Sequence, residues 1–118
     1  MSLLTQKRLA WSLGGGLTIL GLLGWLVVDL GLTSTHDLAH LVPGLALVVA
    51  GFGQARGRPR RALFLGVAAF YVAVGAMSLI VPEAVEPTLG ISAWANGVHL
   101  LGGLALLGVP FLLAPGDA

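Results

Sequence analysis

The chain has 118 residues, of which 57% are hydrophobic and only 9% are charged, and its formal net charge is +1. A soluble domain of this length needs more charged side chains to cover its surface, so this composition argues against one. Cysteine is absent, which excludes disulfides and thiolate metal sites.

Four uncharged segments follow one another along the chain, and each can supply the roughly 20 residues that a helix needs to cross a bilayer. We therefore expect an all-α integral membrane four-helix bundle that forms one transmembrane domain over residues 1–118. The predicted spans are about 9–31, 36–54, 62–81 and 93–113. The first segment lacks a small-x-small cleavage site after it, which indicates a retained helix and not a signal peptide.

The charges predict the orientation of these spans. With four spans, all basic residues fall on one side of the membrane: Lys7, Arg8, Arg56, Arg58, Arg60 and Arg61. The acids Asp29, Asp37, Glu83 and Glu86 fall on the other side. The positive-inside rule then predicts a multi-pass protein of the cell (inner) membrane with both termini in the cytoplasm. The GRPRR segment at 57–61 is expected to be a tight turn whose arginines contact lipid head groups. Arginines beside a membrane do not indicate a nucleic-acid partner.

The second and fourth segments resemble each other. HLVPGLALVV at 40–49 aligns with HLLGGLALLG at 99–108, and Asp37 then aligns with Asn96. The first and third segments match more loosely, as RLAWSLG at 8–14 and RALFLG at 61–66. We therefore interpret the chain as two tandem repeats of a transmembrane helical hairpin, at about 8–55 and 61–114.

The repeat makes one geometric prediction. The second and fourth spans run in the same direction, so His40 and His99 lie at matching depth near the outer leaflet. In an up-and-down bundle both histidines can face one central space.

The segment THDLAHLVPGLALVVAG resembles the repeat signature of the family known as domain of unknown function 4383, which comprises small bacterial four-helix membrane proteins. The first half of that pattern is matched by His36, Asp37, His40, Leu41 and Gly44, with Asp37 where the family has Asn. The second half is matched by Asn96, His99 and Leu100. The resemblance implies a multi-pass protein of the bacterial inner membrane and supplies no activity.

The first interpretation of the polar residues is structural. Ser34 or Thr35 can cap the second span and Ser92 the fourth. The outer cluster of His40, His99, Asp37, Asn96 and His36 would then fix helix packing or meet a partner, either a second copy of the chain or another membrane protein. On this interpretation the chain is a structural or accessory membrane protein with no cofactor and no enzymatic activity.

A metal site is the main alternative. His36 and His40, four residues apart, can reach one ion, and the site could be completed by His99, Asp37, Glu83 or Glu86. His36 aligns with Ala95 in the repeat, so we expect His36 to be the least involved and to lie in water at the outer face.

Two further alternatives remain open from the sequence. A haem could be held between His40 and His99, although the outer side has no Arg or Lys to pair with its propionates. An oligomer could conduct protons or cations past the histidines, although the inner half of the second and fourth spans has almost no polar lining.

Overall fold

The computed structural model describes residues 3–26, 33–52 and 58–112, and within them the chain is all-α, with five helices and no strand. The helices are α1 (Leu3–Leu26), α2 (Ser34–Phe52), α3 (Arg58–Ile80), α4 (Pro82–Leu89) and α5 (Ala93–Leu112). The long helices correspond to the four predicted spans, and α4 is an additional short helix that the sequence did not indicate.

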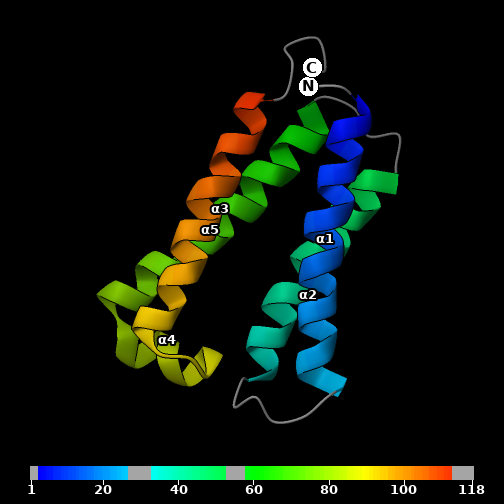
Figure 1. Cartoon of the computed structure of the whole chain (residues 1–118). Helices are drawn as coiled ribbons and strands as arrows, with labels where there is room; N and C mark the ends of the chain where they lie inside the picture. The colour runs from blue at the N-terminus through cyan, green and yellow to red at the C-terminus, as the bar shows by residue number, and fades with distance from the viewer. Residues whose placement is uncertain (1–2, 27–32, 53–57, 113–118) are drawn as a thin grey trace.

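The four long helices form two closely packed pairs, α1 with α2 and α3 with α5. The pairs diverge, and α3 crosses behind the space between α1 (blue) and α5 (orange), as Figure 1 shows. A small apolar core lies where the pairs meet; its buried residues are Ala10, Leu47, Phe64, Val67 and Tyr71. This arrangement is more open than the compact four-helix bundle expected from the sequence.

Glycine lets the helices of each pair approach closely. A Cβ at Gly21 of α1 would lie 2.7 Å from the carbonyl oxygen of Asp37 and 2.8 Å from the backbone nitrogen of Leu41. In the other pair, a Cβ at Gly75 of α3 would lie 2.5 Å from the backbone nitrogen of Leu100. Leu41 and Leu100 are aligned in the sequence repeat, so in each pair a glycine of the first helix contacts the corresponding leucine of the second helix. The looser alignment of the first and third segments, which pairs Arg8 with Arg61, would place Gly21 one residue before Gly75.

Only part of the membrane prediction is supported. Among the described residues, one helix, Arg61–Ile80, is long and apolar enough to cross a membrane by length and composition. A second candidate span is obtained if two helical segments count as one broken span. They are Pro82–Leu89 and Ala93–Gly108, which are bent by 87° at their junction.

The Arg-rich segment also differs from the expected tight turn. Since α3 begins at Arg58, the GRPRR segment is helical over its last four residues, and Pro59 occupies a first-turn position that proline favours. Arg61 is exposed on the first turns of α3, and only the backbone is described for Arg58 and Arg60. Arg56 lies outside the described residues.

Candidate metal centre

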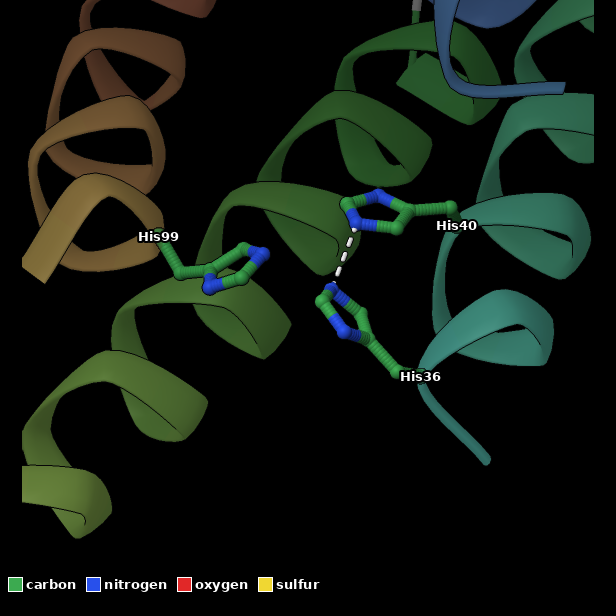
Figure 2. A group of neighbouring side chains, drawn as sticks. All are labelled: His36, His40 and His99. Carbon is green, nitrogen blue, oxygen red and sulfur yellow. Dashed lines mark hydrogen bonds between the residues drawn. The ribbon is translucent and has the colours of Figure 1, made fainter. Parts of the chain in front are cut away.

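All three histidines of the chain meet where the helix pairs come together. His36 and His40 come from α2 and His99 comes from α5, and Figure 2 shows one ring nitrogen of each facing the space between them. The ring centroid of His40 lies 4.8 Å from that of His36 and 5.4 Å from that of His99. One nitrogen from each ring falls within 4.8 Å of the others, which is close enough for a shared metal ion. We call these residues the histidine cluster.

The start of α2 places two of these rings on one helix face. Thr33 precedes the helix, and its Oγ1 accepts a hydrogen bond from the backbone N–H of His36 at 3.3 Å. One turn later, His40 lies directly above His36 because residues four apart share a face. Thr33 is thus the capping residue, in place of the predicted Ser34 or Thr35.

The short helix α4 fixes the ring of His36. The last carbonyl groups of a helix have no partner within that helix. The carbonyl oxygen of Leu89, the last residue of α4, lies 3.1 Å from Nδ1 of His36. Because a carbonyl oxygen only accepts, Nδ1 of His36 carries the proton, and Nε2 keeps its lone pair in the neutral ring.

Asn96 holds the ring of His99 in the same manner. Its Oδ1 lies 2.6 Å from Nδ1 of His99, one turn further along α5. Asn96 is fully buried, and its Nδ2 has no hydrogen-bond partner among the described residues. The amide oxygen accepts the Nδ1 proton, so Nε2 of His99 also presents a lone pair to the cluster.

Tyr71 of α3 completes the pattern. Its hydroxyl donates to the carbonyl oxygen of Ala39 at 3.1 Å and lies 3.3 Å from Nδ1 of His40. When the hydroxyl proton goes to Ala39, the phenol oxygen accepts from Nδ1 of His40; when it goes to Nδ1, His40 carries its own proton on Nε2. The Tyr71 ring also stacks on His99, with the planes 8° apart and the centroids 5.6 Å apart. The hydrogen bond to Ala39 joins the two helix pairs, whereas the stack on His99 lies within the α3–α5 pair.

The contacts of Nδ1 place the proton there in His36 and in His99, and the Tyr71 hydroxyl allows either tautomer of His40. With the proton of His40 also on Nδ1, each Nε2 lone pair is available to a metal ion in the cluster. Outer hydrogen bonds of this kind orient the imidazoles in metal sites. The arrangement has an immediate consequence, because Nε2 of His36 and Nε2 of His40 lie only 2.9 Å apart. In the neutral cluster Nε2–H of His40 can donate to Nε2 of His36, and a metal ion bound there would take the place of that proton.

The sequence predicted a different role for His36 and Asp37. His36 is only 5% exposed and belongs to the cluster, instead of lying in water as expected, because α4 covers it. Asp37 is equally buried, but its carboxylate packs against Gly24 of α1 and is not part of the ligand group found in the described chain. Glycine at position 24 leaves the room that the carboxylate fills.

The remaining predicted ligands also lie elsewhere. Glu83 is exposed, and Glu86 uses its Oε1 to accept the backbone N–H of Ala93 at 2.6 Å. A carboxylate at this position caps the start of α5 and complements the helix dipole. Ser92 makes a longer contact there, with Oγ 3.4 Å from the nitrogen of Ala95.

The cluster does not fit a haem. A porphyrin would have to enter between His40 and His99, whose ring centroids lie 5.4 Å apart. The ring of His36 already occupies the space beside both, at 4.8 Å and 5.5 Å. A single small cation suits this geometry, and a flat macrocycle does not.

Two contributors were missed at the sequence level. Tyr71 lies in the predicted third span, where no sequence pattern links it to the histidines, and a backbone carbonyl such as that of Leu89 leaves no signal in a sequence. Comparison of the chain with protein-family models, with curated proteins and with solved structures gives no match.

Proposed function

We propose that the chain is a small multi-pass membrane protein whose histidine cluster binds one divalent transition-metal ion. The proposal is carried by the convergence of one nitrogen from each of the three rings within 4.8 Å, with each Nδ1 atom engaged by an oxygen outside the cluster. A metal ion would take the place of the proton that lies between His36 and His40. Imidazole is a preferred ligand of zinc, copper and nickel.

The spacing of the ligands supports a tetrahedral ion. Zinc–nitrogen bonds of 2.0–2.1 Å in a tetrahedron put the nitrogens roughly 3.3 Å apart. The distances in the cluster extend from 2.9 Å to at most 4.8 Å, so small ring rotations bring all three to that value. Three histidines leave a fourth position open, as in catalytic zinc sites. Magnesium and calcium prefer oxygen ligands and are disfavoured here.

The exposed surface supports the membrane part of the proposal. Large apolar side chains face outward on all four long helices; among them are Ile19, Leu20, Val42, Val49, Leu79, Ile80, Val98 and Leu101. Lipid is the solvent in which such a surface costs least. We propose a four-span topology with the basic ends of the helices and both termini in the cytoplasm, and with the cluster near the outer leaflet.

Tandem duplication of a hairpin would account for the corresponding contacts of Gly21 with Leu41 and of Gly75 with Leu100. Membership of the domain of unknown function 4383 family, and association with a second copy or another membrane protein, stay predictions of the sequence. A conducting oligomer also stays a prediction.

A second candidate function is purely structural. Tyr71 bonds to Ala39, and His36 bonds to Leu89, so the cluster ties α2 to α3 and α4 without any metal. In that case a proton is shared by His36 and His40, and the cluster fixes how the helix pairs meet.

Thermal unfolding of the purified protein in detergent separates the two candidates. Zn²⁺ binding to the folded state alone adds RT ln(1 + [Zn²⁺]/Kd), or about 2.7 kcal/mol at a hundredfold excess over Kd, and a chelator removes it. We expect this stabilisation in the wild type and in Ser78→Ala, whose buried hydroxyl bonds within α3. We expect its loss in His99→Ala. Equal unfolding temperatures of the wild type with Zn²⁺ and with chelator would leave the structural candidate.

A further inference from the structure

An apolar groove leads away from the histidine cluster. One wall is a stripe of leucines on a single face of α1, at Leu9, Leu13, Leu17 and Leu20. The opposite wall is α5, with Val98, Gly102, Ala105 and Leu106. These are the two helices that face each other across the opening in Figure 1. The groove has a volume of about 520 Å³, within the range of small-molecule sites.

The polar part of the groove is confined to one region. Its only polar side chains among the described lining residues are His40, Tyr71 and His99, and two of these belong to the cluster. His99 lies near the start of α5, whereas Leu106 and the antiparallel Leu9 lie toward the other end. From Leu20 to Leu9 the α1 wall extends about 16 Å at 1.5 Å per residue. The groove thus joins a small polar end to a long apolar trough.

A metal in the cluster would favour an anionic fourth ligand over water. Three neutral imidazoles leave its double positive charge uncompensated, and an unpaired charge in apolar surroundings is costly. The charged head group of such a ligand must also be small, because the described lining of the groove includes no Arg or Lys that could pair with a larger phosphate group. A carboxylate meets both conditions and is a normal zinc ligand.

We propose that the groove binds a long-chain carboxylic acid, with its carboxylate on the metal's fourth position and its alkyl chain along the α1 leucines. This inference rests on the proposed metal centre, and it adds the chemical class of the ligand. Both the carboxylate and the alkyl chain of the ligand are required, because the metal binds the charge and the apolar groove accommodates the length of the chain.

The test uses the full-length protein in detergent, loaded with Co²⁺, and three probes: a C16 fatty acid, the C16 alcohol and butyrate. The fatty acid should change the visible Co²⁺ spectrum and bind at least about tenfold more tightly than either of the others. Equal binding of the alcohol, equal binding of butyrate, or fatty-acid binding that persists after Co²⁺ removal would each overturn the proposal.

A matched pair of variants tests the trough. Gly102 lines the groove, Gly66 lines a different surface hollow, and a Cβ at either meets nothing within 4 Å. Gly102→Phe should abolish fatty-acid binding and retain Co²⁺ affinity, whereas Gly66→Phe should change neither. Co²⁺ binding without any spectral response to the fatty acid would contradict this inference alone. Absence of Co²⁺ binding would contradict the metal centre as well.

Discussion

Nε2 of His36 lies 2.9 Å from Nε2 of His40, while Nδ1 of His36 donates to the carbonyl oxygen of Leu89 and Nδ1 of His40 lies beside the Tyr71 hydroxyl. The two imidazoles form an ordinary hydrogen bond when His40 carries its proton on Nε2 and accepts the Tyr71 hydroxyl proton at Nδ1. Either that proton or a metal ion occupies the space between the two nitrogens, and this choice decides between a metal centre and a hydrogen-bonded cluster.

Acid should weaken metal binding, because protons compete for the same Nε2 lone pairs. Between about pH 7 and about pH 4 we expect the Zn²⁺ affinity to fall by about tenfold or more, as the ring nitrogens of the cluster take up protons. Competition with a chromophoric chelator at each pH measures it. An affinity that stays constant or rises on acidification contradicts histidine ligation.

Asn96→Ala should lower metal affinity by about 10–100-fold, since it removes the oxygen that orients His99. Asn96→Asp keeps an acceptor for Nδ1 of His99 and replaces Nδ2, which has no partner among the described residues, with a carboxylate oxygen whose negative charge favours a bound cation. We therefore expect Asn96→Asp to retain most of the affinity, measured by Zn²⁺ competition. If Asn96→Asp loses as much affinity as Asn96→Ala, orientation of His99 is not the role of Asn96.

Gly21→Ala should destabilise the α1–α2 pair by about 1–3 kcal/mol, because the new methyl group would press on the backbone of α2. Gly15→Ala is the control on the same helix, where a Cβ meets nothing within 4 Å. Alanine there should be neutral or stabilising by up to about 1 kcal/mol through helix propensity. Unfolding in detergent measures both, and equal effects of the two variants would argue against close packing at Gly21.

The proposed topology can be tested with introduced cysteines, because the chain has none of its own. Arg61 is exposed near the start of α3, and Glu83 is exposed just beyond the end of α3, in the first turn of α4. In intact bacterial cells, a membrane-impermeant maleimide should label Glu83→Cys and should label Arg61→Cys only after permeabilisation. The reverse pattern contradicts the orientation derived from the arginines.

The sequence predicted the meeting of His40 and His99, because the repeat aligned two polar residues that are rare in apolar helices. It misjudged Asp37, which aligns with Asn96 but has a different environment. Asp37 faces Gly24 and turns toward α1, whereas Asn96 turns its oxygen to His99. An alignment records the residue at a position and not the space that a neighbouring helix leaves beside it.

His36 was misjudged for a similar reason. Its lack of a counterpart in the repeat suggested that it lies in water, but α4 covers it and supplies the Leu89 carbonyl. The α4 segment PEAVEPTL lies between the predicted third and fourth spans, where the sequence analysis expected no helix. The first proline instead starts the helix, and Gly90 ends it with a left-handed conformation at φ 71°.

The most direct test of the metal centre is a Co²⁺ titration of the purified protein, followed by visible absorption, for the wild type and for His36→Ala, His40→Ala and His99→Ala. The metal centre requires one Co²⁺ per chain in the wild type, with the intense absorption of a tetrahedral site that Zn²⁺ displaces. Each single variant should lose that spectrum. A wild type without it, or a His36→Ala variant that keeps it unchanged, contradicts a centre built from all three histidines.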